Sequence, residues 1–317
     1  MNTIENIIFM GTPFFAVPVL QKLIKKGYKP NLIITQPDKK SGRGRKITYS
    51  PVKKVGLEFD IPIFQPENIN NPTSIKKIKN IEPDLIVVVA YGKFIGKTIL
   101  NIPKHKCINL HPSLLPKYRG PSPINWALFN GDKFSGNSII YISSKMDAGD
   151  IIYQTKIPIL PEDNYGSLKK KLSIKGADDI LHTIELIEND TINPKPQNDE
   201  AASFSKLITK KMRMINWRDS AENIKNLIRG LAPKPAAFSV LDDQEMKIIQ
   251  ANVWNNSVDK SEFAKISSVI KGEGFLVGTS SKQLLIKKIK PAGKQKMSAF
   301  SYSLGNEIEG KKFLNVK

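Results

Sequence analysis

Short apolar runs rich in valine and isoleucine alternate with segments of helical character along the first half of the chain. Such alternation is the pattern of consecutive βαβ units, and it predicts an α/β fold with an open, doubly wound and mainly parallel sheet. Sheets of this kind bind ligands beyond the carboxyl ends of their strands. The residues that follow each run are therefore the first candidates for a functional site. The expected strands cover residues 7–10, 32–35, 85–90, 107–110 and 138–142.

A different organisation is expected after a long helical pattern over residues 165–188. Residues 190–205 contain Pro194 and Pro196, many turn formers and no apolar periodicity, which indicates a linker. Beyond it, one helical stretch is followed by several short alternating runs with turn signals between them, which predicts a small β-barrel. We therefore expect a first domain over residues 1–189, a linker over 190–205 and a second domain over 206–317.

Basic charge is the unusual part of the composition. The 317 residues include 49 Lys and Arg against 29 Asp and Glu, a net charge of +20, which indicates an anionic partner unless a general bias toward lysine supplies it. Between residues 36 and 54, seven basic residues stand against one aspartate. Glycines among them favour a flexible loop that suits a phosphate backbone, although a merely solvated loop is the alternative. The candidate polyanion-binding residues, which include lysines just past the linker, are Lys39, Lys40, Arg43, Arg45, Lys46, Lys206, Lys210 and Lys211.

Two polar residues stand at the end of the expected strand over residues 107–110. Period-2 alternation places Asn109 and His111 on one side of the strand, an amide donor beside a titratable imidazole. Two donors aimed at one spot suit an oxyanion that develops on a carbonyl under attack, where each donor is typically worth about 3 kcal/mol. Each residue taken singly is more often structural. The stiff apolar stretch Ser113-Leu114-Leu115-Pro116 that follows suits the wall of a pocket for a flat ligand.

Asp147 lies in the turn-like stretch Met146-Asp147-Ala148-Gly149-Asp150 between two expected strands. A carboxylate near His111 would favour the cationic imidazole and could accept a proton through water, although such a stretch is more often only a turn.

Three scattered histidines and one cysteine give no metal-ligand spacing, so no metal site is predicted. Cys107 is expected to be a buried reduced thiol. The absence from the sequence of a long apolar stretch favours a cytoplasmic protein without a membrane span.

Over essentially its whole length the sequence resembles the methionyl-tRNA formyltransferases. The set Asn109, His111, Ser113-Leu114-Leu115-Pro116 and Asp147 resembles that of the wider group of enzymes that take formyl groups from 10-formyltetrahydrofolate. The glycine-rich basic stretch after the second strand and Lys290-Pro291-Ala292-Gly293 resemble features of the tRNA enzymes. Further residues that carry the resemblance are Phe9-Met10-Gly11-Thr12-Pro13, Gln36-Pro37-Asp38, Ser50-Pro51-Val52-Lys53 and Tyr118-Arg119-Gly120.

The resemblance implies a formyltransferase catalytic domain followed by an OB-like, tRNA-binding barrel. It implies transfer of the formyl group from 10-formyltetrahydrofolate to the α-amine of methionine on initiator methionyl-tRNA. Asn109 and His111 would hold the oxyanion and Asp147 would assist proton transfer. The protein would act in the cytoplasm as a monomer, without metal or an obligate protein partner. The folate would lie against Ser113, Leu114, Leu115, Pro116, Val89 and Tyr91.

The sequence leaves two alternative functions open. One is a folate-dependent formyltransferase with a small amine acceptor, either a purine precursor or a nucleotide amino sugar; neutralising the basic charge of residues 36–54 separates it from a tRNA enzyme. The other is a non-catalytic RNA-binding protein. Replacing Asn109, His111 or Asp147 separates that class, because a binder loses nothing while an enzyme loses turnover.

Overall fold

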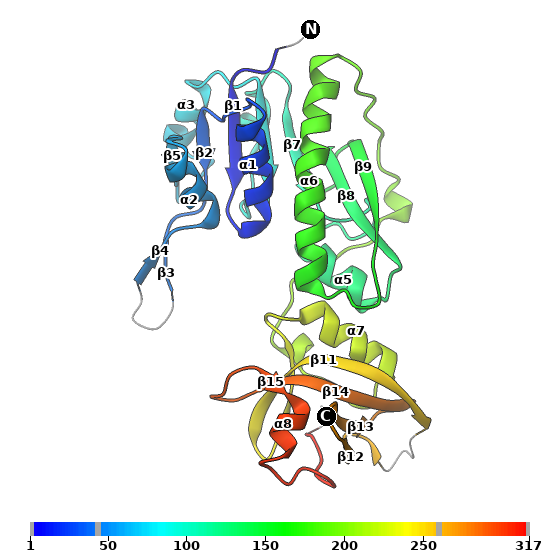
Figure 1. Cartoon of the computed structure of the whole chain (residues 1–317). Coiled ribbons are helices and arrows are strands. Elements are labelled where there is room, and N and C mark those ends of the chain that lie inside the picture. Colours follow the sequence, from blue (N-terminus) through cyan, green and yellow to red (C-terminus); the bar gives the residue numbers. More distant parts are fainter. Residues whose placement is uncertain (1–2, 42–45, 258–261, 315–317) are drawn as a thin grey trace. The chain divides into compact units, whose positions relative to one another are not determined.

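The structure, a computed structural model, describes residues 3–41, 46–257 and 262–314. The chain forms two compact units (Figure 1). Unit 1 comprises residues 1–120, 135–158 and 169–204, and unit 2 comprises residues 121–134, 159–168 and 205–317. The domain limits expected from the sequence, at residues 189 and 206, stay a prediction.

Unit 1 is built on a seven-stranded sheet with the strand order β5-β2-β1-β6-β7-β8-β9. The pairs from β5 across to β7 are parallel, whereas β7 and β8 are antiparallel. Every strand expected in the first half of the chain is present, so the prediction of a mainly parallel sheet is confirmed. The bounds are β1 (Ile7–Gly11), β2 (Leu32–Ile34), β5 (Ile63–Phe64), β6 (Leu85–Val89), β7 (Cys107–His111), β8 (Phe134–Tyr141) and β9 (Ile151–Pro158).

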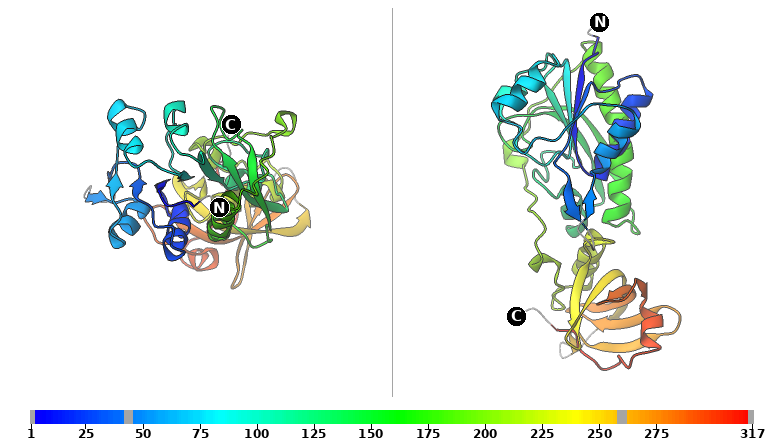
Figure 2. Two further views of the ribbon diagram at one scale, coloured as in Figure 1. Left: turned by 90° about the horizontal axis from the view of Figure 1, so that it is seen from above. Right: turned by 90° about the vertical axis from the view of Figure 1, so that its left-hand side faces the viewer.

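Helices cover both faces of this sheet (Figure 2). α1 and α6 lie on one face, where Lys22 of α1 pairs with Asp178 of α6. α3 and α4 lie on the other face, over an apolar core that includes Ile8, Ile86 and Cys107. The bounds are α1 (Val17–Lys25), α2 (Pro51–Glu58), α3 (Pro72–Lys79), α4 (Lys97–Leu100) and α6 (Tyr165–Glu188). No helix in the described part of the chain is long and apolar enough to cross a membrane.

Helix α2 begins at Pro51, because Ser50 Oγ accepts a hydrogen bond from Lys53 N at 3.0 Å and a proline occupies the first position. α3 starts in the same way, with Asn71 accepting from Ser74 N at 2.7 Å. The sequence pattern does not predict α3, α4 and β5. They span only 8, 4 and 2 residues, which is too short for apolar periodicity to develop.

Unit 2 combines helices α5 (Pro123–Phe129) and α7 (Ala221–Leu231) with an antiparallel sheet in the order β10-β11-β14-β13-β12, in which β15 also pairs with β14. The expected small barrel-like domain is confirmed. Register shifts between β11 and β14 let the long strand β11 bend around the core. The bounds are β10 (Ala237–Leu241), β11 (Gln244–Ser257), β12 (Ile266–Ile270), β13 (Gly274–Gly278), β14 (Lys282–Pro291), β15 (Met297–Ser298) and α8 (Ala299–Ser303).

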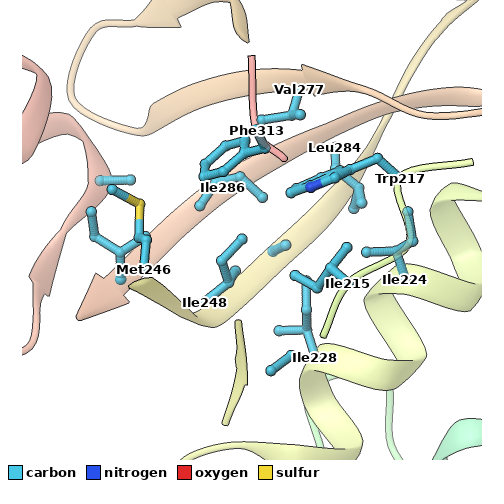
Figure 3. Packing of buried hydrophobic residues seen from close by; sticks show 14 of the residues in the cluster. Ile215, Trp217, Ile224, Ile228, Met246, Ile248, Val277, Leu284, Ile286 and Phe313 are labelled. Carbon is cyan, nitrogen blue, oxygen red and sulfur yellow. The ribbon is translucent and has the colours of Figure 1, made fainter. Parts of the chain in front are cut away.

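Trp217 is fully buried in the apolar core of unit 2 (Figure 3). Its ring stacks on Phe313 with the centroids 5.1 Å apart, and its Nε1 donates a hydrogen bond to Ser239 Oγ at 3.0 Å. Ile224 and Ile228 of α7 pack against the same cluster. The helix and the sheet of unit 2 therefore share one apolar core.

The Cys107 thiol gives a test of the core of unit 1. Burial raises the pKa of the thiol from 9.0 to about 12. Because the thiolate is the reactive form, native protein at about pH 8 should react with iodoacetamide at least about 10³-fold more slowly than urea-unfolded protein. Mass spectrometry of timed samples measures the two rates. Similar rates would mean that the core under α3 and α4 is open in solution.

Candidate active site

The carboxyl ends of β1, β2 and β6 are tied together by the residues that follow them. Thr12, just after β1, donates its hydroxyl to the carbonyl of Tyr91 at 3.2 Å. Gln36, which follows β2, donates its side-chain amide to the same carbonyl at 2.9 Å and its backbone N–H to Thr12 Oγ1 at 3.3 Å. This edge of the sheet is therefore a fixed platform, at the position where open α/β sheets bind ligands.

β7 carries the two predicted oxyanion donors to that edge. Asn109 is half-buried, whereas the other four residues of β7 are buried, and the structure gives its side-chain amide no hydrogen-bond partner among the described residues. His111, two residues further on, points to the same side of the strand and is 4% exposed. Its Nε2 lies 2.9 Å from the carbonyl of Tyr118. Because a carbonyl only accepts, Nε2 carries a hydrogen, and Nδ1 is the nitrogen left to gain or lose a proton.

Asp147 lies beside the free nitrogen of His111. The distance from Asp147 Oδ2 to His111 Nδ1 is 3.6 Å, longer than a direct hydrogen bond. The same oxygen accepts a hydrogen bond from the backbone N–H of Gly120 at 2.8 Å, which fixes the carboxylate. A proton on His111 Nδ1 would therefore lie close to the fixed negative charge of the Asp147 carboxylate. The structure brings His111 and Asp147 together and places Asn109 on the same strand as His111.

The turn that carries Asp147 is tightly constrained. Asp147 has a φ of 48°, a left-handed conformation that Asp and Asn tolerate better than most residues. A Cβ at Gly149 would lie 1.7 Å from the carbonyl oxygen of Tyr141, so only glycine fits where this turn closes. The Asp-Ala-Gly-Asp stretch is thus a turn, as its composition indicates, and also the support of the candidate acid–base group.

The sequence pattern does not predict two backbone groups of this site, the carbonyl of Tyr118 and the amide of Gly120. Both belong to the Tyr118-Arg119-Gly120 stretch that contributed to the resemblance. Their roles depend on backbone atoms, which every residue type carries. The stretch itself is therefore the only sequence signal that could have pointed to them.

The predicted folate wall begins directly after β7. Ser113 is buried and donates its hydroxyl to the carbonyl of Lys117 at 2.6 Å, and the backbone N–H of Leu115 donates to Ser138 Oγ at 3.1 Å. Leu114 and Pro116 are half-buried. The wall is therefore rigid and keeps part of its apolar surface accessible.

Val89 and Tyr91 were also expected to contact the folate. Val89 is fully buried, and the ring of Tyr91 lies in the core under α3 and α4. Burial raises the pKa of the Tyr91 hydroxyl to about 12. Since both side chains face the core, a contact with the folate at these positions would use backbone atoms. Their assignment stays a prediction.

The basic stretch of unit 1 forms a hairpin rather than only a flexible loop, because β3 (Lys39–Ser41) and β4 (Lys46–Thr48) pair in antiparallel register. Arg43 and Arg45 lie outside the described residues. Asp38, at the base of the hairpin, binds Lys53 and accepts a hydrogen bond from Gln65 at 2.9 Å, and these contacts hold the pKa of its carboxyl below its usual value. The single acid of this stretch is thus paired internally.

The second predicted basic group lies in unit 2. Lys206, Lys210 and Lys211 are all exposed, and they belong to one short segment that ends in a 3₁₀ turn over Lys211–Arg213. Exposed lysines close together in the chain produce a local positive potential. Among the residues that the structure describes, no group of three or more His, Cys, Asp or Glu residues could hold a metal ion.

Two family models match the chain. The model described as "Formyl transferase" matches residues 5–184. The model described as "Formyl transferase, C-terminal domain" matches residues 207–307. Together they match the greater part of both units.

Curated relatives match over nearly the whole chain. A methionyl-tRNA formyltransferase of Alkaliphilus oremlandii is 44% identical over 307 residues, which are 96% of this chain and 97% of the relative. A methionyl-tRNA formyltransferase of Thermodesulfovibrio yellowstonii is 44% identical over 305 residues, with the same shares of 96% and 97%.

Solved structures share the fold at lower identity. HypX from Aquifex aeolicus, solved with tetrahydrofolic acid, has a TM-score of 0.67 at 15% identity over 97% of this chain and 49% of HypX, so this chain spans about half its length. WlaRD, a sugar 3N-formyl transferase solved in the presence of dTDP and 5-N-formyl-THF, has a TM-score of 0.66 at 20% identity over 93% of this chain and 100% of WlaRD. At these identities the likeness concerns the fold alone.

Proposed function

The chain belongs to the formyl transferase family, among the methionyl-tRNA formyltransferases, and on that premise we propose its reaction and its active residues. It transfers the formyl group of 10-formyltetrahydrofolate to the α-amino group of methionine on initiator methionyl-tRNA. The observation that carries the proposal is the His111–Asp147 pair, 3.6 Å apart and next to a half-exposed amide, in a chain with this family relationship.

The residues of the site suit an attack by an amine on a formyl carbon. Model α-amines have a pKa of about 7.7–8.0, so part of such an amine is neutral near pH 7 and needs no strong base. As the new C–N bond forms, the formyl oxygen gains negative charge. The amide of Asn109, which has no hydrogen-bond partner among the described residues, and a proton on His111 Nδ1 are the donors for that charge.

Asp147 completes the scheme. Its carboxylate, held by the Gly120 N–H, balances the charge of a protonated His111 and takes up the proton of the attacking amine through water. That proton goes to the folate nitrogen as the old C–N bond breaks. No covalent bond to the protein forms, and the folate donor is a substrate that lies against the Ser113-to-Pro116 wall.

The test of this proposal is an assay of formyl transfer from 10-formyltetrahydrofolate to initiator methionyl-tRNA, with glycinamide ribonucleotide as the acceptor in a parallel reaction. Transfer to the tRNA alone is expected. Transfer to the small amine alone would leave the reaction intact and overturn the proposed acceptor. No transfer to either would overturn the proposal as a whole, and saturable tRNA binding without turnover would identify an RNA-binding protein.

The basic hairpin supplies a prediction about the acceptor. Replacing Arg43 and Arg45 by glutamine should weaken binding of the tRNA and reduce the slope of log affinity against log salt by about 2, since each lost phosphate contact removes about 1. The KM for the folate should not change. In the control, Lys76 and Lys79 are replaced by glutamine. Both lysines are exposed on α3, so the control loses the same charge at another place on the surface. An unchanged salt slope in the Arg43/Arg45 variant would exclude these residues from the tRNA contact.

We also propose that the protein is a cytoplasmic monomer, that its catalytic domain spans residues 1–189 and its tRNA-binding domain residues 206–317, and that Lys39, Lys40, Lys46, Lys206, Lys210 and Lys211 contact the tRNA. The high net charge of +20 supports the monomer, because like charge opposes self-association. Light scattering of the purified chain tests it.

A further inference from the structure

The stretch of unit 1 that follows α6 is bound along the site. The backbone carbonyl of Lys195 accepts a hydrogen bond from the N–H of Ile151 at 2.8 Å, and the N–H of Lys195 donates to the carbonyl of Ile151 at 2.9 Å. Ile151 lies next to the turn that carries Asp147. Further along, Ser203 Oγ accepts a hydrogen bond from the backbone N–H of Tyr118 at 3.0 Å. Residues 195–203 therefore contact both loops that support His111 and Asp147, although their composition indicated only a linker.

Gln197 lies in the middle of this stretch, and its side chain joins the two loops. Its Nε2 donates hydrogen bonds to the carbonyl of Asp147 at 2.8 Å and to the carbonyl of Gly149 at 2.7 Å. Its Oε1 accepts a hydrogen bond from Arg119 Nε at 3.0 Å. Because the two carbonyls only accept hydrogen bonds and the guanidinium only donates, the orientation of the amide is fixed. Its nitrogen faces the carbonyls and its oxygen faces Arg119.

Arg119 anchors Gln197 from the other side. Its side chain is only 5% exposed and also pairs with Asp199 at 2.8 Å, and the hydrogen bond and charge of Arg119 hold the pKa of the Asp199 carboxyl below its usual value. Along the chain, Arg119 stands between Tyr118, whose carbonyl binds His111, and Gly120, whose N–H binds Asp147. The path from Arg119 through Gln197 thus links the backbone supports of both catalytic groups.

We infer that Gln197 is a positioning residue, which holds the backbone of Asp147 so that its carboxylate stays within reach of His111 Nδ1. The inference rests on the proposed role of Asp147. The turn needs such support because its neighbour Met146 is 68% exposed and Asp147 itself has a left-handed φ of 48°. A misplacement of about 1 Å at a reacting group can cost about 10²-fold in rate, so a loosened turn is expected to lower turnover strongly.

The decisive variant is Gln197→Met, which keeps the length of the side chain and removes all three hydrogen bonds. Its kcat is expected to fall by about 10-fold to 100-fold, while the KM values for the folate and the tRNA stay within about 3-fold of wild type. Gln197→Glu keeps the acceptor for Arg119 but turns an anionic oxygen toward the carbonyls of Asp147 and Gly149. It should lose at least as much turnover as Gln197→Met.

The matched control is Asn198→Ala in the next position. The Asn198 side chain accepts a hydrogen bond from Glu200 N at 3.0 Å, on the exposed side of the same stretch, so the control loses a hydrogen bond without touching the Asp147 turn. Its kcat should stay within about 2-fold of wild type. Wild-type turnover in Gln197→Met would overturn the inference. An equal loss in Asn198→Ala would also overturn it, because the effect would then come from general loosening of the stretch.

Asp147→Asn, measured in parallel, separates a failure of this inference from a failure of the proposed function. If Asp147→Asn retains turnover, the proposed role of Asp147 is wrong and Gln197 has nothing to position. If Asp147→Asn loses turnover while Gln197→Met keeps it, the role of Asp147 stands and only the positioning by Gln197 is wrong.

Discussion

Asp147→Asn is expected to lower kcat by about 10²-fold to 10⁴-fold, the usual range for the loss of a positioned proton-transfer group. The variant keeps the shape of the side chain and an oxygen that can accept the hydrogen bond from Gly120 N. Asparagine also tolerates the left-handed φ of 48° at this position, so the turn should keep its conformation. What the variant loses is the negative charge beside His111 Nδ1 and the ability to take up a proton.

Initial rates of formyl transfer at saturating folate and tRNA measure this loss, and thermal melting confirms that the variant is folded. Asp150→Asn is the matched control, because Asp150 is exposed in the same stretch of chain and the same charge is removed. The control should stay within about 2-fold of wild type. Turnover of Asp147→Asn within about 3-fold of wild type would show that the reaction does not use this carboxylate.

Trp217→Ala is expected to reduce the free energy of unfolding of unit 2 by about 3–5 kcal/mol, the usual cost of truncating a buried aromatic side chain. Trp217 is fully buried, and its removal abolishes the stacking on Phe313 and the hydrogen bond to Ser239. Helix α7 and the sheet meet at this residue (Figure 3), so a cavity here weakens the contact between them.

Urea unfolding followed by tryptophan fluorescence measures the change. All three tryptophans of the chain, Trp126, Trp217 and Trp254, belong to unit 2, so the fluorescence of the two that remain reports on that unit. Trp254→Ala is the matched control, since Trp254 is half-exposed in β11 and its truncation should cost much less. Equal losses in the two variants would mean that Trp217 does not hold the core together.

The sequence predicted the parts of the site that depend on local pattern. Alternation along residues 107–111 placed Asn109 and His111 on one side of β7, and the structure has both at the carboxyl end of that strand. The resemblance marked Asp147, and the structure puts it 3.6 Å from His111 Nδ1. The hairpin formed by β3 and β4 was missed, because the glycines between them indicated a flexible loop.

The supports of the site could not be predicted, because they join residues that lie far apart in the chain. The Gly120–Asp147 hydrogen bond spans 27 residues, and the Gln197–Asp147 hydrogen bond spans 50. Neither hydrogen bond produces an apolar periodicity or a motif spacing that can be recognised in the sequence. Gln197 moreover lies in a stretch with prolines and turn formers, whose composition is that of a linker and carries no sign of its contacts.

The sequence by itself determined where the longer strands and helices form, where the basic charge gathers and which residue types stand at the end of β7. These features depend on apolar periodicity, helix caps and composition, each of which acts over a few neighbouring residues. Only the tertiary structure decided which imidazole nitrogen of His111 is free, how close Asp147 comes to it, and that Gln197 holds the Asp147 turn. Those properties depend on backbone carbonyls and amides from separate loops, and only the packing of the folded chain brings them together.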